Sequence, residues 1–193
     1  MFERGFKSWC ENVSLEIRRE LKLAEHAALP TSDLASYLGV ALWGVHEVVG
    51  LDPAALGVLL RPQDDNWSAL TVSWDGKDAV VFNSSHSERR QSSDVMHELA
   101  HILAGHPPST VILSADGLTA LRTFSRQQEE EANWLSGSLL LPRPALMSIA
   151  RARQPTWATC DEYKVSEDLL SYRMNVSGVV TQLRRARGRV GGA

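Results

Sequence analysis

The first regular feature of the chain is a run of apolar residues that recur every three or four positions, as on one face of an amphipathic helix. These apolar positions are Phe6, Cys10, Val13, Ile17 and Leu21. The helix is expected to end before Pro30, because proline is excluded from helix interiors. Residues 31–33 then offer a polar cap for a short helix that runs through Leu38 and stops at Gly39.

The next two elements are short. Residues 40–43 fit a first strand. Asp52 followed by Pro53 is typical of a cap and a first helical position, which predicts a short helix over residues 54–60.

The clearest strand signal is a pair of β-rich segments, residues 68–74 and 79–83. Between them lies Asp-Gly at positions 75–76, a sequence that favours a tight hairpin turn. A polar loop is expected over residues 84–93, and it leads to Asp94, whose carboxylate is expected to cap the following helix.

That helix should run to about residue 103 and end at the Gly105-His106-Pro107-Pro108 segment. Residues 110–126 are ambiguous, with residues 111–113 as a possible strand, whereas residues 127–141 have a strongly helical composition. The rest of the chain indicates helices that are broken near Pro155, Lys164 and Ser177.

A sheet followed by one helix and then by further helices predicts an α+β fold. The chain has 193 residues, which suits one domain with a helical appendage and is long enough for a real core. We therefore expect a main domain over residues 1–145 and a helical C-terminal lobe over residues 146–193 that packs on it.

The central helix carries the pattern His97-Glu98-Leu99-Ala100-His101, which is H-E-x-x-H. Residues four apart share one helix face, so both imidazoles can reach a single zinc ion, and Glu98 can take a proton from a water on that ion. The residues expected on the opposite, buried face are Val95, Leu99, Ile102 and Leu103. A lone histidine is usually structural, but this arrangement favours a metal site.

A third ligand is needed, and the metzincin spacing does not supply it, because Gly105 and His106 are each displaced by one position. In zincins with a glutamate ligand, the third ligand comes from a later helix. The suitable cluster is residues 129–131, three glutamates in a row. Helical geometry favours Glu129 as the ligand, with Glu131 as the alternative. Asn133, one turn after Glu129, is a candidate to hydrogen-bond a ligand, and a solvated acidic face is the ordinary alternative for the cluster.

Together these motifs resemble the ImmA/IrrE family of zinc metallopeptidases. The resemblance rests on H-E-x-x-H at 97–101, E-x-x-A-N at 129–133 and L-L-P at 140–142, and it extends from about residue 7 to residue 185. It implies a zincin-like core in which His97, His101 and Glu129 bind Zn²⁺ and Glu98 is the catalytic base. Characterised members cleave a helix-turn-helix transcriptional repressor. The resemblance therefore implies a zinc metalloendopeptidase, a hydrolase whose partner is a repressor substrate and which takes part in transcription regulation.

The sequence leaves two parts of the mechanism open. Stabilisation of the oxyanion needs a donor, and His106, Tyr172, Arg173 and Arg90 are all of the right type. We also expect one strand of the 68–83 hairpin to pair with an extended substrate by β-augmentation.

Residues 157–174 read as helix, turn and helix, with Ser166 as the cap of the second helix, and a basic end follows. The basic residues of that end are Arg184, Arg185, Arg187 and Arg189. Contact with DNA is one interpretation. A small helical lobe with a solvated basic tail is favoured, because such lookalikes are common and the net charge is −3.

The composition of the chain also indicates in which cellular compartment the protein is expected. Residues 1–7 contain no apolar signal region, and no run approaches the length of a membrane span, so a cytoplasmic protein without membrane contact is expected. Cys10 and Cys160 fit no disulfide framework, which agrees with a reducing compartment. The alternative function, from a different class, is a zinc-containing binding module that sequesters a regulator or contacts DNA without cleavage.

Overall fold

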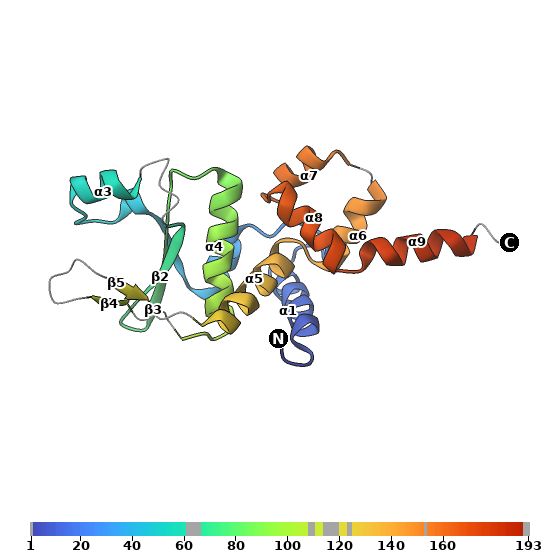
Figure 1. Ribbon diagram of the computed structural model, residues 1–193, viewed down its shortest axis with the longest axis horizontal. Helices are drawn as coiled ribbons and strands as arrows, with labels where there is room; N and C mark the ends of the chain where they lie inside the picture. The colour runs from blue at the N-terminus through green and yellow to red at the C-terminus, as the bar shows by residue number, and fades with distance from the viewer. Residues whose placement is uncertain are drawn as a thin grey trace.

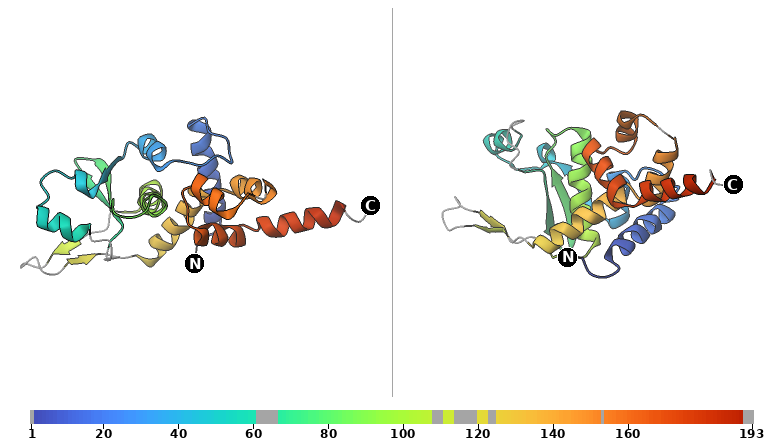
Figure 2. Two further views of the ribbon diagram at one scale, coloured as in Figure 1. Left: turned by 90° about the horizontal axis from the view of Figure 1, so that it is seen from above. Right: turned by 45° about the vertical axis from the view of Figure 1, so that its right-hand side comes forward.

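The computed structural model describes residues 2–60, 67–107, 111–113, 120–122, 125–152 and 154–190. Within these residues the fold is α+β, as predicted, with a three-stranded sheet at one side and a group of helices at the other (Figure 1). The last helix, α9 (Val179–Val190), extends away from the rest of the molecule in all three views of Figures 1 and 2.

The two N-terminal helices begin and end close to their predicted limits. They are α1 (Phe6–Glu20) and α2 (Thr31–Leu38), and α2 stops at Gly39 in the left-handed conformation, with φ 70°. The predicted polar cap is wrong, because Pro30 is the N-cap residue and no side chain caps α2. Thr31 instead occupies the first helical position.

The sheet has the strand order β1-β3-β2, with β1 (Ala41–Gly44) parallel and β2 (Ala69–Trp74) antiparallel to the central strand β3 (Lys77–Phe82). The predicted hairpin is confirmed, since Asp75 and Gly76 both have positive φ angles, of 52° and 71°. Positive φ angles at both central residues are typical of the two-residue hairpin turn whose backbone twist matches that of the flanking strands.

Two short helical elements lie between β1 and β2. The 3₁₀ turn η1 (Val45–Glu47) follows β1, and α3 (Pro53–Leu59) is the helix expected after Asp52. The Asp52 carboxylate accepts a hydrogen bond of 2.7 Å from the backbone of Ala54, which confirms the predicted cap.

The central helix α4 (Glu88–Leu103) starts earlier than expected. Its N-cap is Ser87, so residues 88–93 are helical and the predicted polar loop is half as long. Asp94 therefore lies inside the helix and is not its cap. Its carboxylate contacts Nδ1 of His86 at 3.0 Å, which connects the loop to the helix.

The helices after α4 agree with the predicted breaks. They are α5 (Arg126–Leu140), α6 (Arg143–Ala152), α7 (Thr156–Glu162), α8 (Glu167–Val176) and α9. Ser166 caps α8 by accepting a hydrogen bond of 3.1 Å from the backbone of Leu169. Residues 111–113 do form a strand, β4 (Val111–Leu113), paired with β5 (Ala120–Arg122); the rest of the ambiguous segment before α5 lies largely outside the described residues.

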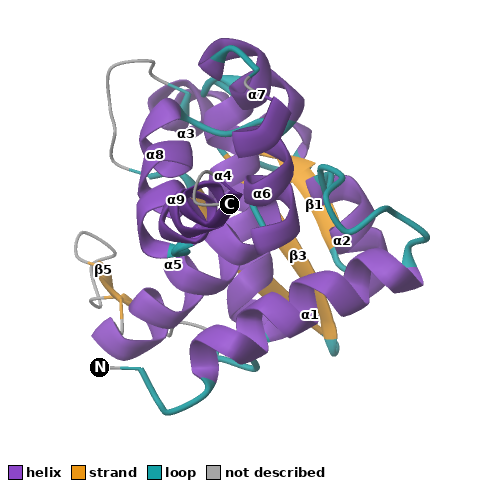
Figure 3. Cartoon of the chain, turned by 90° about the vertical axis from the view of Figure 1, so that its right-hand side faces the viewer, coloured by secondary structure: helices purple, strands orange, loops and turns teal. Residues whose placement is uncertain are grey.

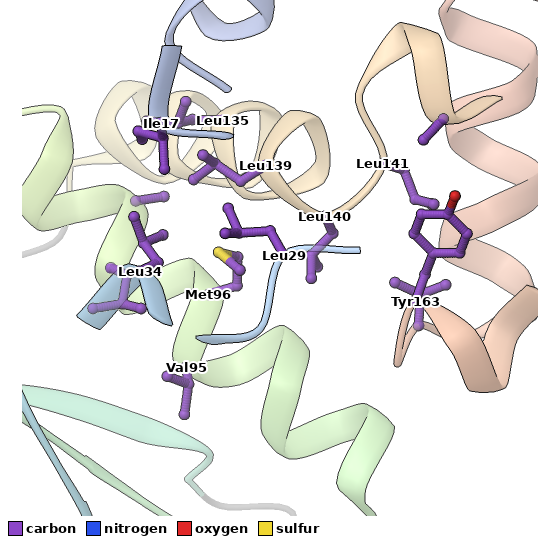
Figure 4. Packing of buried hydrophobic residues seen from close by; sticks show 14 of the residues in the cluster. Ile17, Leu29, Leu34, Val95, Met96, Leu135, Leu139, Leu140, Leu141 and Tyr163 are labelled. Atoms are coloured by element: carbon purple, nitrogen blue, oxygen red, sulfur yellow. The ribbon is translucent and has the colours of Figure 1, made fainter. Parts of the chain in front are cut away.

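One hydrophobic core joins the helices to the sheet. In Figure 4, Ile17 of α1 faces Leu135 and Leu139 of α5, and Met96 of α4 lies close to Leu34 of α2. All five side chains are buried, and each contributes about 1.5–3 kcal/mol relative to an exposed position. Figure 3, seen from the side of α9, shows α1 crossing in front of the strands and α2 beside β1. The core therefore fixes α4 against α5.

A buried arginine holds the C-terminal end of α5. Arg18 donates hydrogen bonds to the carbonyl of Leu139 at 2.7 Å, to the carbonyl of Ala27 at 3.0 Å and to the hydroxyl of Ser14 at 2.7 Å. Its burial lowers the pKa of the Arg18 guanidinium to about 10. The carbonyls of a helix end have no partners within the helix, and Arg18 supplies one for α5.

A second buried arginine connects the C-terminal helices to α1. Arg173 of α8 is 1% exposed and binds the Glu11 carboxylate at 2.6 Å and the Leu141 carbonyl at 3.1 Å. Tyr163 adds a hydrogen bond of 2.7 Å to the carbonyl of His26. These contacts join residues on the two sides of the boundary expected at residue 145, and the boundary itself stays a prediction. No helix in the described ranges is long and apolar enough to cross a membrane.

Candidate metal centre

The H-E-x-x-H histidines lie together on one face of α4. The Nε2 atoms of His97 and His101 are 3.0 Å apart, and the two rings meet edge to face with centroids 4.8 Å apart. A spacing of four residues produces this arrangement, because side chains at i and i+4 stand above one another on a helix. Both imidazoles therefore present the same nitrogen to one point.

The third group at that point is Glu129, from the first turn of α5. Its carboxylate Oε2 lies 3.2 Å from Nε2 of His97, and Oε1 lies 3.6 Å from Nε2 of His101. Glu129 is thus the glutamate that joins the two histidines, as helical geometry had favoured. The core contact between α4 and α5 is what brings these side chains together.

The spacing of the three donors suits a small tetrahedral ion. With bonds of about 2.0–2.1 Å, two ligands of a tetrahedral zinc are about 3.3 Å apart. The closest donor pairs here span 3.0, 3.2 and 3.6 Å. The three side chains are 16–25% exposed, so solvent can reach the fourth position. Three ligands and one open position are typical of a catalytic metal site.

Glu98 is buried between α4 and the sheet, with 6% of its surface exposed. Its Oε2 accepts a hydrogen bond of 2.7 Å from the hydroxyl of Thr71 on β2. A buried carboxylate needs such partners, because burying a charge without hydrogen bonds is costly. The H-E-x-x-H pattern predicts a role for Glu98 but not for Thr71, because the register between a strand and a helix is a tertiary property.

The sequence of the chain also matches a known family. A model of the peptidase M78 family, described as the IrrE N-terminal-like domain, matches residues 55–175, which is more than half of the 193 residues. The chain belongs to the ImmA/IrrE family of metallopeptidases. No match is found among curated proteins. The matched region includes the hairpin, α4 and α5, so every residue of the candidate site lies within it.

Two further side chains lie next to this candidate metal centre. His106 lies just after the end of α4, as expected for a helix-end residue, and its Nδ1 is 2.9 Å from Nδ1 of His101. Glu131 was the alternative ligand, but its carboxylate contacts Nε2 of His106 at 3.2 Å instead. Asn133, the candidate partner of a ligand, is exposed, and its side chain makes no hydrogen bond within the described residues.

The candidates for oxyanion stabilisation lie in different surroundings. Arg173 is buried and bound to Glu11, so it cannot also serve the metal centre. Both ring nitrogens of His106 already have partners, since Nδ1 contacts His101 and Nε2 contacts Glu131. Tyr172 is 49% exposed and packs edge to face with Trp134, and Arg90 lies two turns before His97, near Asp94.

Proposed function

We propose that this chain is a zinc-dependent endopeptidase that hydrolyses a specific protein substrate, a helix-turn-helix transcriptional repressor. The observation that carries the catalytic part is the convergence of His97, His101 and Glu129, next to the buried carboxylate of Glu98. Two imidazoles and one carboxylate around an open position are the ligand set of zinc hydrolases. Membership of a metallopeptidase family supports the same reaction class.

In this proposal, His97, His101 and Glu129 would hold a zinc ion, which would supply a Lewis acid for the scissile carbonyl and would lower the pKa of a water toward about 7. Glu98 accepts the water proton and later gives it to the leaving amine. Because the Thr71 hydroxyl donates its hydrogen bond to Oε2 of Glu98, the other carboxylate oxygen, Oε1, is the one that carries the proton. The Thr71 hydroxyl also fixes the direction of the carboxylate, so the base is oriented before the substrate arrives.

The sheet offers a place for an extended substrate. β2 is an outer strand in the order β1-β3-β2, and through Thr71 it is in direct contact with Glu98. A substrate strand paired with β2 would therefore run past the catalytic base, which supports β-augmentation as the mode of substrate binding. Because β3 is central, β2 is the strand of the hairpin that can accept a substrate.

The choice of a repressor as substrate rests on the resemblance of H-E-x-x-H, E-x-x-A-N and L-L-P to family members that cut such proteins. A repressor would be cut inside the cell that it regulates, which agrees with the expected cytoplasmic location. The function as regulatory protease follows from this substrate.

The test is a substrate trap, Glu98→Gln. The carboxamide oxygen still accepts the Thr71 hydrogen bond and the metal ligands are untouched, so the variant should keep zinc while its turnover falls by about 10²–10⁴-fold. Proteins captured by the trap from native lysate are identified, purified and incubated with the wild type, with the trap and with Glu130→Gln. Glu130 is an exposed neighbour of the ligand that pairs with Arg126, so it serves as the matched control.

Cleavage of a captured helix-turn-helix repressor by the wild type and by Glu130→Gln, but not by the trap, is the expected result. Cleavage of some other captured protein would support the proposed peptidase activity but contradict the proposal that the substrate is a repressor. If all three forms bind a partner and none of them cuts it in the presence of zinc, the alternative function is favoured, in which the chain sequesters a regulator without cleavage.

A further inference from the structure

His106 and Glu131 form a chain of hydrogen bonds behind His101. Nδ1 of His101 lies 2.9 Å from Nδ1 of His106, and Nε2 of His106 lies 3.2 Å from the carboxylate of Glu131. The His106 and Glu131 side chains are only 8% and 14% exposed. Both contacts are therefore largely shielded from water, where hydrogen bonds constrain protonation most strongly.

With Glu131 ionised and His106 neutral, the chain of contacts has one direction. The ionised Glu131 carboxylate can only accept, so Nε2 of His106 must donate to it. In neutral His106 the other nitrogen, Nδ1, is then an acceptor, and Nδ1 of His101 must donate to it. In that state His101 carries its proton on Nδ1, and its Nε2 lone pair is directed toward His97 and Glu129.

We propose that His106 and Glu131 are positioning residues that hold His101 in the tautomer and ring orientation needed to bind the metal. This inference rests on the zinc site of the proposed function. It adds to that site the two side chains that prepare one of its ligands. Groups that hydrogen-bond the far nitrogen of a histidine ligand typically contribute 10–100-fold to metal affinity.

The local fold places each member of the chain. α4 ends at Leu103, and Gly105 follows with φ 67°, a left-handed conformation that glycine adopts at low cost. The backbone N–H of His106 then donates to the carbonyl of His101 at 3.0 Å. This turn folds the His106 ring back onto the last turn of the helix, where it meets the His101 ring edge to face at a centroid distance of 5.0 Å.

Glu131 is held from its own helix. Gln127, one turn earlier on α5, donates a hydrogen bond of 2.9 Å to Oε1 of Glu131, and this leaves Oε2 for His106. Glu129 and Glu131 are two positions apart, so they lie on different sides of α5: Glu129 contacts the metal-facing nitrogens, and Glu131 contacts the ring behind them. The row of three glutamates thus has three different surroundings, because Glu130 pairs with Arg126.

Two substitutions of His106 separate hydrogen bonding from packing. His106→Phe keeps a ring against His101 but has no acceptor, whereas His106→Asn loses the ring and keeps an oxygen at the position of Nδ1. Zinc dissociation constants are measured by competition with a chromophoric chelator. We expect His106→Phe to weaken zinc binding by about 10–100-fold and His106→Asn to stay within about threefold of the wild type. The reverse order, with the phenylalanine variant tighter, would overturn the proposal.

A double-mutant cycle tests the link to Glu131. Glu131→Ala should weaken zinc binding by about tenfold in the wild type and have little effect when combined with His106→Asn, because the shorter side chain no longer reaches the carboxylate. Glu130→Ala is the control and should change nothing. An equal loss from Glu131→Ala in both backgrounds would overturn the positioning role. A wild type that binds no zinc would instead overturn the proposed function together with this inference.

Discussion

The hydroxyl of Thr71 donates a hydrogen bond of 2.7 Å to Oε2 of Glu98, across the contact between the outer strand β2 and helix α4. The two residues are 27 positions apart in the chain. Because β2 both contacts the proposed base and is the edge strand open to a substrate, the strand that would bind the peptide also orients the carboxylate that would activate the attacking water. The next two predictions follow from this arrangement.

Removing the Thr71 hydroxyl should slow the reaction without loss of metal. Thr71→Val keeps the shape of the side chain and removes the donor, and a hydrogen bond to a charged group contributes about 1.5–3 kcal/mol. We expect kcat/KM on the captured substrate to fall about 10–100-fold, while the zinc dissociation constant stays unchanged. Thr71→Ser, which keeps the hydroxyl, should be close to wild type. A Thr71→Val enzyme with full activity would contradict this role.

Blocking the outer edge of β2 should weaken substrate binding. In the register with β3, Ser73 faces Asp78, and the hydrogen bond of 2.8 Å from the backbone of Asn83 to Ser68 sets which residues alternate as bonded pairs. By that alternation the N–H of Ser73 points away from β3. Ser73→Pro should therefore leave the sheet intact and raise KM several-fold with little change in kcat. Ser73→Ala is the control, and an unchanged KM for the proline variant would exclude pairing at this position.

Loss of the carboxylate ligand should abolish tight metal binding. Glu129 contacts both histidine nitrogens, so Glu129→Ala leaves two ligands on one helix. We expect zinc affinity to fall by more than the roughly 100-fold that loss of an outer hydrogen-bonding partner can cause. Glu130→Ala should keep wild-type affinity. Equal losses from the two variants, measured by chelator competition, would show that general acidity rather than ligation holds the ion.

Replacing each of two helical glycines with alanine should change the free energy of unfolding in opposite directions. A Cβ on Gly137 of α5 would lie 3.1 Å from Cδ of Arg173, whose guanidinium is held by Glu11 and Leu141, whereas a Cβ on Gly57 of α3 would meet nothing within 4 Å. In a helix interior, alanine is more favourable than glycine by about 1 kcal/mol of stability. We expect Gly57→Ala to stabilise by about that amount and Gly137→Ala to destabilise, as measured by urea unfolding. A stabilising Gly137→Ala would mean that Arg173 can move aside.

Stability should fall at alkaline pH because of one thiol. Burial, with a smaller contribution from the charge of Glu11, raises the pKa of Cys10 from 9.0 to about 12. Below pH 9 both the folded and unfolded states hold the proton, and above it only the folded state does, so this part of the stability is lost as pH rises from 9 to 12. Between pH 8 and pH 10 the unfolding free energy of the wild type should drop by about 1.4 kcal/mol more than that of Cys10→Ala. Parallel curves for the two proteins would contradict this assignment.

The sequence alone was sufficient wherever chemistry depends on spacing along one element. H-E-x-x-H placed His97 and His101 on one helix face, and the Asp-Gly turn defined the hairpin. The helix breaks near Pro155 and Lys164 were also correct, since proline and a residue with positive φ are local features. The predicted start of α4 was wrong, because Asp94 is of a residue type that often caps helices, whereas α4 begins at Glu88 with Ser87 as its N-cap.

The tertiary structure decided everything that depends on two elements meeting. Three adjacent glutamates have nearly the same local sequence, yet contact between α4 and α5 directs Glu129 to the ligands, Glu131 to His106 and Glu130 to solvent and Arg126. In the same way, Thr71 and Glu98 are partners only because the hairpin packs on α4 in one register. The sequence by itself therefore determined which residues can bind a metal and move a proton. Burial and helix packing determined which of them lie together, because those contacts join residues that no spacing rule connects.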